Sequence, residues 1–171
     1  MKKLLLVAMI AVGITAKAQE TSFGAVAGFN STTVSASSNG ISASTSASGF
    51  YVGFFADFEV SDKISIVPEL QYVSASKNGE SINEIALPIM AKYNVSEKFS
   101  LQAGPMLDLV VDKTSDEFNK FGLGLAAGIG YDFTENIFAT SRYSFGLTNR
   151  VENSSVSTKM GFFQIGLGYR F

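Results

Sequence analysis

Residues 121–133 have the sequence FGLGLAAGIGYDF, in which apolar or aromatic residues occupy every second position. The positions between them hold four glycines, Ala126 and, near the end, Asp132. Side chains repeat with a period of two on one face of a β-strand, whereas an α-helix repeats every 3.6 residues. The segment is therefore predicted to be a strand with one apolar face and one face of small residues.

The same alternation recurs along the chain and predicts eight strands, at residues 22–30, 49–60, 64–72, 84–95, 99–109, 121–133, 137–147 and 162–171. Most of them have about ten residues, the length of a tilted strand that crosses a membrane. Residues 60–64, 95–99 and 133–137 are near-copies (VSDKI, VSEKF and FTENI) and predict tight hairpin turns. The four other connections are predicted to be long loops, at residues 31–48, 75–83, 112–120 and 148–160.

The composition indicates a membrane protein. Hydrophobic residues make up 46% of the chain and charged residues only 16%, whereas average soluble domains carry about 25% charged residues. A closed barrel is the only sheet that satisfies its backbone inside lipid. A secreted lipocalin-like barrel would show the same period with its apolar face inside, but its outer face should then be dense in Lys and Glu. The mixed face here holds mostly Gly, Ser, Ala and Gln, which favours a membrane barrel with a crowded lumen.

The first residues have the pattern of a signal peptide. Lys2 and Lys3 precede an apolar run at residues 4–15, and Ala16-Lys17-Ala18 is an A-x-A cleavage site. We therefore expect residues 1–18 to be removed and residues 19–171 to form an eight-stranded antiparallel up-and-down transmembrane β-barrel. Short turns on one rim and long loops on the other are typical of outer-membrane barrels. Both termini are then expected on the short-turn, periplasmic side.

Several motifs carry a resemblance to a known group of proteins. The chain ends in alternating apolar residues with an aromatic residue last: Phe163, Ile165, Leu167, Tyr169 and Phe171. This ending resembles the signal by which the barrel-assembly machinery recognises its clients. With residues 142–147 (RYSFGL), Asn149, residues 84–88 (EIALP) and Lys92-Tyr93, the chain resembles the PorT-like and OmpA/OmpX/OmpW-like small, porin-like outer-membrane barrels. The resemblance implies an outer-membrane location with lipid and the assembly machinery as partners.

Absent residue types restrict the chemistry. The chain has no Cys and no His, which excludes thiol nucleophiles, zinc knuckles and imidazole bases. The barrel enzymes of the resembling group use His, so no enzyme is expected. A net charge of −2 gives no basic patch for nucleic acid. Asp108, Asp112, Asp116 and Glu117 lack the spacing of an EF-hand, so neither a metal nor a cofactor is predicted.

Nine charged residues fall on the predicted inward face: Asp57, Glu59, Glu69, Glu84, Lys92, Asp108, Asp132, Arg142 and Arg170. Eight strands enclose an interior just wide enough for side chains, where an unpaired charge is costly. Arg142 adjoins a strand whose inward positions are nearly all Gly or Ala. We predict a polar network centred on Arg142 and Lys92, with Glu69, Glu84 and Asp108 as partners. It would act as a stabilising plug or, as an alternative, line a proton or ion path.

These observations favour a structural or surface-interaction role. The loops at 31–48, which is rich in Ser and Thr, and at 148–160 are the predicted contacts for a surface partner. The alternative is a narrow channel or a secretion or transport accessory, the role that the PorT-like resemblance suggests. The third interpretation is a secreted soluble ligand-binding β-barrel.

Overall fold

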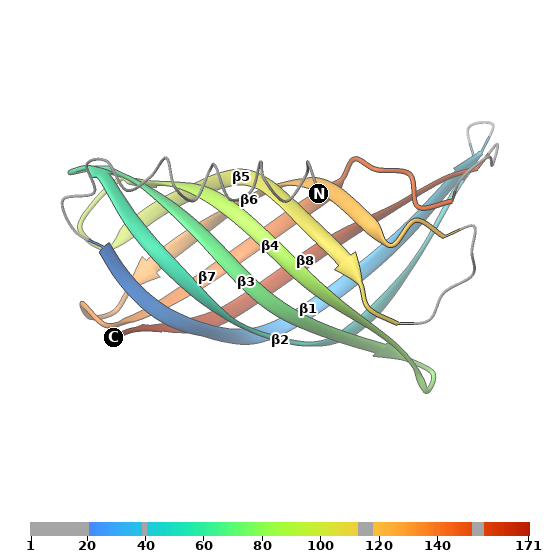
Figure 1. Cartoon of the computed structure of the whole chain (residues 1–171), viewed down its shortest axis with the longest axis horizontal. Coiled ribbons are helices and arrows are strands. Elements are labelled where there is room, and N and C mark those ends of the chain that lie inside the picture. The colour runs from blue at the N-terminus through green and yellow to red at the C-terminus, as the bar shows by residue number, and fades with distance from the viewer. Residues whose placement is uncertain (1–20, 39–40, 113–117, 152–155) are drawn as a thin grey trace, which may run out of the picture.

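The computed structural model describes residues 21–38, 41–112, 118–151 and 156–171, which form a closed barrel (Figure 1). The predicted signal peptide, residues 1–18, lies outside the described residues. Each strand pairs antiparallel with its neighbour in the sequence, and β1 also pairs with β8 to close the ring. This arrangement confirms the predicted fold class. The strands are β1 (Thr21–Ser38), β2 (Ile41–Ser61), β3 (Ile64–Lys77), β4 (Glu80–Asn94), β5 (Phe99–Val110), β6 (Phe121–Asp132), β7 (Ile137–Gly146) and β8 (Ser157–Arg170).

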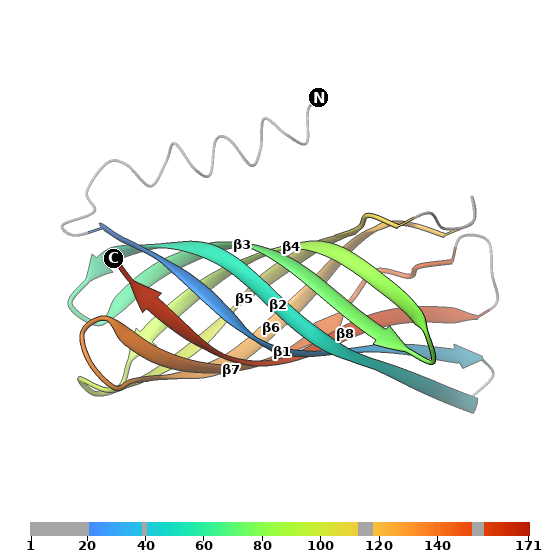
Figure 2. The ribbon, with the colours of Figure 1, turned by 90° about the horizontal axis from the view of Figure 1, so that it is seen from below.

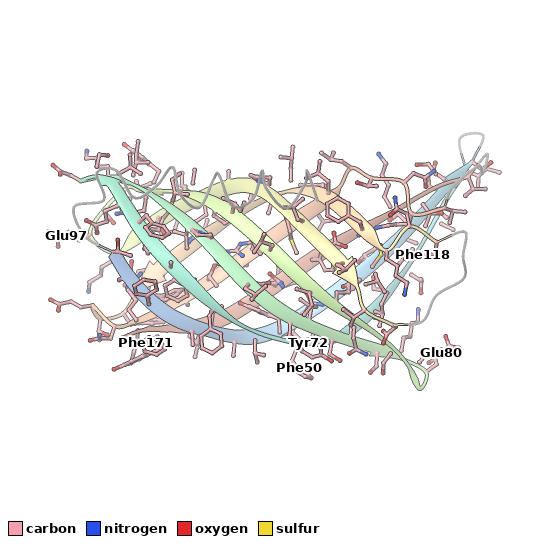
Figure 3. The ribbon with its side chains drawn as sticks, in the orientation of Figure 1. Phe50, Tyr72, Glu80, Glu97, Phe118 and Phe171 are labelled. Atoms are coloured by element: carbon pink, nitrogen blue, oxygen red, sulfur yellow. The ribbon has the colours of Figure 1, made fainter. Side chains whose placement is uncertain are left out.

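The outer wall of the barrel is apolar. Phe54 is 67% exposed and Leu125 53%, whereas Tyr51 on the inward face is 1% exposed. Outward side chains cover the barrel from end to end in Figure 3. The alternation therefore faces outward as predicted, and an apolar surface of this extent is suited to lipid. Among the described residues, no helix is long and apolar enough to cross a membrane.

The three short turns, at residues 62–63, 95–98 and 133–136, lie on one rim with the start of β1 and the chain end, as predicted (Figure 2). We call this rim the turn rim and the opposite one the loop rim. The Ser96 and Thr134 hydroxyl oxygens accept hydrogen bonds from the backbone N–H groups of Phe99 and Ile137, at 3.1 and 3.0 Å. The Ser or Thr shared by the repeated motifs therefore closes these turns.

Two of the four predicted long loops are instead continuations of strands. Residues 31–38 of β1 pair with residues 41–48 of β2, and β3 pairs with β4 as far as Lys77 and Glu80. Asn78 and Gly79 make the β3–β4 turn with φ of 52° and 87°, the left-handed pair that a two-residue hairpin turn requires. The loops predicted at 31–48 and 75–83 were wrong because these polar segments lack the apolar alternation that marked the other strands.

The other two connections, at residues 111–120 and 147–156, begin and end close to the predicted boundaries. They contact each other through a β-bridge between Phe118 and Val151. The described parts of these connections therefore form one structure at the loop rim.

Candidate functional site in the lumen

The middle of the lumen is held by an ion pair between Arg142 of β7 and Glu69 of β3. Arg142 Nη2 lies 2.6 Å from Glu69 Oε1, and Nη1 lies 3.0 Å from Oε2. Both side chains are buried. Two parallel hydrogen bonds of this kind are the strongest geometry available to an Arg and a carboxylate. The pair therefore fixes two strands across the interior of the barrel.

Three glutamines extend this cluster. Gln102 of β5 accepts a hydrogen bond from Arg142 Nη2 at 3.1 Å. Gln71 donates to Glu69 at 2.6 Å, and Gln164 of β8 donates to Gln71 at 3.0 Å. The network thus links four strands through neutral amides, which sequence reasoning had placed on the mixed face without giving them a role.

Glycine on β6 makes room for Arg142, as the sequence predicted. Arg142 lies directly opposite Gly128, where an added Cβ would come within 3.2 Å of the Arg142 Cβ and closer still to the Ser141 carbonyl oxygen. Since that space belongs to backbone, a side chain at position 128 would displace the strand rather than rotate away.

Lys92 forms a separate cluster nearer the turn rim. Its ammonium pairs with Asp57 of β2, and not with the predicted Glu69, Glu84 or Asp108. The register explains this correction, because Lys92 lies opposite Ser65, on the turn-rim side of Glu69. The predicted single network centred on Arg142 and Lys92 is therefore two clusters.

A second ion pair and two aromatic rings lie around the same small cavity as Lys92. Arg170 Nη2 lies 2.6 Å from Asp132 Oδ1, and its guanidinium carbon lies 4.6 Å from the ring centre of Phe138. Phe138 meets Phe55 edge to face with ring centres 5.4 Å apart. Phe138 lies opposite Asp132 and Phe55 lies opposite Glu69, so the two rings connect the turn-rim charges with the Arg142 cluster.

Asp108 pairs at the loop rim with Arg150, a residue that sequence reasoning had placed in a loop. The guanidinium Nη2 contacts the Asp108 carboxylate, and Nη1 donates to the carbonyl oxygens of Lys120 and Asn119 at 3.0 and 3.4 Å. Arg150 is 2% exposed, and an added Cβ on Gly122 would overlap its guanidinium. Gly122 lies opposite Asp108, and its missing side chain was the sequence signal that a side chain from a connection could occupy this space.

Glu84 was predicted to pair with Arg142 or Lys92, and it pairs with neither. It is fully buried, and within the described residues neither carboxylate oxygen has a hydrogen bond. In the β4–β5 register it lies beside Asp108 on the inward face, because Ala86 is opposite Asp108 and Glu84 is opposite Val110. The structure thus brings Glu84 to the Asp108–Arg150 pair but not to Arg142.

Apolar side chains fill the space between the polar clusters. Met90, Met106, Met160 and Phe162 are nearly fully buried there. Beside Arg142 and Gln102 lies a cavity of about 20 Å³, which is room for roughly one water molecule. The lumen of the described barrel is packed rather than open at this level.

No group of three or more His, Cys, Asp or Glu residues within the described ranges has the geometry to hold a metal ion. Asp116 and Glu117, which the sequence placed near Asp108 and Asp112, lie outside those ranges.

A closed ring of eight strands with an apolar outer wall and a polar, packed lumen defines a small outer-membrane β-barrel. Residues 4–171 match the family model described as outer membrane protein beta-barrel domain, and the chain belongs to this family. The location that the family gives is the bacterial outer membrane. The family is broader than the PorT-type resemblance noted in the sequence.

Solved structures of small barrels share this fold. Ail, the attachment invasion locus protein of Yersinia pestis, has 13% sequence identity and a TM-score of 0.58, covering 90% of this chain and 100% of Ail. Neisserial surface protein A has 19% identity and a TM-score of 0.55 with the same coverage. Ail in complex with the heparin analogue sucrose octasulfate has 15% identity and a TM-score of 0.55, again covering 90% of this chain and 100% of Ail. At these identities the likeness concerns the fold. No curated protein matches the chain.

Proposed function

We propose that this protein is a non-enzymatic surface protein of the bacterial outer membrane that contacts a partner through its loop rim. In this proposal residues 1–18 are a cleaved signal peptide, residues 19–171 are the barrel domain, and both termini face the periplasm. The alternating C-terminal residues Phe163 to Phe171 address the chain to the barrel-assembly machinery. All five side chains are exposed on the outward face of the barrel, which supports this role because such a signal consists of one apolar strand face.

The paired extension of β1 and β2 is the observation that carries the proposal. These strands have 18 and 21 residues, whereas a tilted strand crosses the membrane with about 9–11. The excess forms a hydrogen-bonded hairpin at the loop rim, and its β1 half also pairs with β8 as far as Ser37 and Ser157, so it extends beyond the β3–β4 side of the rim but not beyond β8 (Figures 1 and 2). A connection that only joined two strands would need no such pairing, but a rigid hairpin holds side chains at fixed positions for a partner.

Arg150 holds the two neighbouring connections together by backbone hydrogen bonds, as strand pairing holds the hairpin. Its backbone N–H donates to the Thr158 carbonyl at 2.7 Å, and its own carbonyl accepts from the Asn119 N–H at 2.8 Å. The described parts of the predicted contact loop 148–160 are therefore attached to the 111–120 connection, so that the two present one surface at the loop rim.

Cysteine labelling in intact cells tests the orientation. The chain has no Cys, so Ser37→Cys near the hairpin tip and Glu97→Cys in a turn each provide one thiol. A membrane-impermeant maleimide should label Ser37→Cys, while Glu97→Cys should react only after the outer membrane is permeabilised. The reverse pattern would contradict the proposed orientation.

A shortened hairpin tests the contact role. Deleting residues 33–46 and joining the strands with Asn-Gly keeps the membrane-spanning part of the barrel and removes the projection. Cells displaying equal amounts of each protein are compared for adhesion to immobilised glycans and matrix proteins. Adhesion should fall with the shortened form; equal adhesion by both would overturn the role of the hairpin.

A narrow channel or a PorT-type secretion accessory is the second candidate. The ion pairs spaced along the lumen from Asp57–Lys92 to Asp108–Arg150 favour it, because charged pairs can pass protons or ions. The packed level at Arg142 opposes it. Planar-bilayer recordings of the wild-type barrel should be silent, and a stable unitary conductance would favour the channel instead.

A further inference from the structure

The outward face of the β1–β2 hairpin carries four directly opposed pairs of hydroxyl side chains. They are Ser31 with Ser48, Thr33 with Ser46, Ser35 with Ser44, and Ser37 with Ser42. We call this set the hydroxyl ladder. Hydroxyl oxygens lie 2.9 Å apart in the second pair and 3.0 Å apart in the last. The ladder continues across β3 and β4, because Ser76 lies opposite both Ser48 and Ser81.

The chemistry of the ladder is that of an uncharged hydrogen-bonding surface. Each hydroxyl can donate one hydrogen bond and accept two, so a paired hydroxyl still has capacity for a ligand. Lys159 of β8, opposite Ser35, borders the ladder. Rows of neutral donors and acceptors match sugar hydroxyls better than they match a phosphate or an acidic peptide, which would require several cations.

An apolar groove of about 690 Å³ lies on the same outer wall, further toward the turn rim. Its floor is formed by Ala25 and Ala27 of β1. Ala27 lies between Leu167 of β8 and Val52 of β2, and Ala25 lies between Tyr169 and Phe54. Small side chains between large ones make a trough on the lipid-facing wall, and an acyl chain is the shape that fills such a trough.

Two phenylalanines separate the ladder from the groove, and Tyr72, which lies opposite Val52, stands at the edge of the groove itself. Phe29 and Phe50 face each other across β1 and β2, in the row between the hydroxyls and the alanines. Phe50 packs near Tyr72, with ring centres 6.4 Å apart, and Figure 3 shows both rings on the outside of the barrel. The Tyr72 hydroxyl donates to Asn83 at 2.9 Å. Aromatic rings with a polar tip are enriched at the membrane–water interface.

We propose that the outer wall of β1, β2 and β3 binds a glycolipid with a neutral saccharide headgroup. The acyl chain lies in the Ala25–Ala27 groove, the interfacial region lies at Phe50 and Tyr72, and the sugar lies on the hydroxyl ladder. From the turn rim toward the loop rim, the groove, the aromatic residues and the ladder follow in the same order as the acyl chain, the interfacial region and the sugar of such a lipid. The groove continues the lipid-facing wall directly, which favours a lipid over a second copy of the chain, and a phospholipid would leave the ladder unused.

This inference rests on the proposed function only in placing the hairpin outside the membrane, so its test is made in a reconstituted bilayer that has no cellular orientation. The purified barrel is placed in nanodiscs of equal parts phosphatidylcholine and digalactosyldiacylglycerol with the same acyl chains. Lipids that stay bound on release from the nanodisc are counted by native mass spectrometry. We expect about a fivefold preference for the galactolipid, the effect of roughly one net hydrogen bond.

Two variants separate the two halves of the site. Removing ladder hydroxyls with Thr33→Ala, Ser35→Ala, Ser44→Ala and Ser46→Ala should abolish the preference while bound phosphatidylcholine stays unchanged. Filling the groove with Ala27→Phe should lower retention of both lipids. The matched controls are Ser141→Ala and Ala103→Phe, which change lipid-facing residues on β7 and β5 and should leave retention at the wild-type level.

The outcomes decide between the occupants. Equal retention of both lipids by the wild type, or a preference that survives loss of the ladder hydroxyls, overturns the saccharide site. A dimer that Ala27→Phe dissociates overturns the lipid and assigns the groove to a second copy. The cysteine-labelling result in cells does not affect the choice between a bound lipid and a second copy. Failure of the nanodisc experiment is therefore distinguishable from failure of the proposed surface role.

Discussion

Arg142 and Arg150 both bury a guanidinium against a carboxylate in the lumen, but the chain brings them there by different routes. Arg142 projects from β7, and the backbone pairing of β7 with β6 and β8 fixes its position. Arg150 comes from the connection after β7 and reaches the lumen only through its own contacts with Asp108 and with two carbonyl oxygens. The first pair is therefore part of the stability of the barrel. The second is the attachment of the loop-rim connections to it.

Replacing Arg142 should produce the largest effect. Arg142→Ala leaves Glu69 without a cation in the middle of the lumen, where water has little access. Removing one partner of a buried pair costs about 3–5 kcal/mol, and we expect a loss of that size in the free energy of unfolding. Urea unfolding in detergent micelles, followed by far-ultraviolet circular dichroism, measures it.

A double variant is the control for this prediction. Arg142→Leu combined with Glu69→Leu removes both charges and should recover most of the loss, since apolar side chains can replace a buried ion pair. A loss for Arg142→Ala no larger than that of a surface pair, at most about 1 kcal/mol, would mean that the cluster does not hold the barrel together.

Replacing Arg150 should have a smaller global effect and a larger local one. In Arg150→Ala the freed connections can move and water can reach Asp108, so we expect a loss of about 1–3 kcal/mol, the cost of an unsatisfied polar group. Lys120, now half-buried and bonded to the Asp112 carbonyl at 2.7 Å, should become susceptible to trypsin in the folded barrel.

Lys77→Ala near the β3–β4 tip is the matched control, because it removes a cation from the loop rim without touching the 111–120 or 147–156 connection. It should leave Lys120 protected. If Arg150→Ala lowers stability as much as Arg142→Ala and Lys120 stays protected, the two arginines play the same role and the comparison fails.

The same difference explains how much the sequence could predict. Strand parity placed Arg142 and Glu69 on the inward face, and the glycines of β6 indicated where Arg142 had room. The alternation shows which face a side chain lies on but not which residues of neighbouring strands lie opposite each other. The sequence therefore could not predict that Lys92 pairs with Asp57. Arg150 was missed because its route depends on contacts between two connections, which no local pattern encodes.

The two extended hairpins were missed for a related reason. Segments 31–48 and 75–83 continue the strands past the apolar rows of the outer wall, and because neither of their faces is apolar the alternation disappears. The described strands are held by backbone pairing and, in the β1–β2 extension, by hydroxyl pairs such as Thr33 with Ser46. The Asn78-Gly79 pair was a local signal for a hairpin turn, whereas nothing apolar marked the pairing of β1 with β2.

The β3–β4 tip lies farther from the lumen than either arginine and should give a still smaller effect. Gly79 has a positive φ of 87° and nothing within 4 Å of an added Cβ. Gly79→Ala therefore adds no clash and costs only the backbone preference, about 1 kcal/mol. Hydrogen exchange should quicken at Lys77 and Glu80, while the midpoint of barrel unfolding changes little. Asn78→Gly, which suits the same turn, should not quicken exchange.

The smallest global change is expected at Gly122. An added Cβ there would meet the guanidinium of Arg150, the far end of a flexible side chain, whereas at Gly128 it would meet backbone next to Arg142. We expect Gly122→Ala to shift the Arg150 guanidinium while leaving its charge beside Asp108, at a cost below about 1 kcal/mol, whereas Gly128→Ala costs about 1–3 kcal/mol, the range for overpacking. In trypsin digestion, Gly122→Ala should expose Lys120 in part, less than Arg150→Ala does, and Gly128→Ala should leave Lys120 protected. This pair of alanines tests the comparison without removing any charge, so the reverse order of effects would show that the strand-borne arginine is the one free to move.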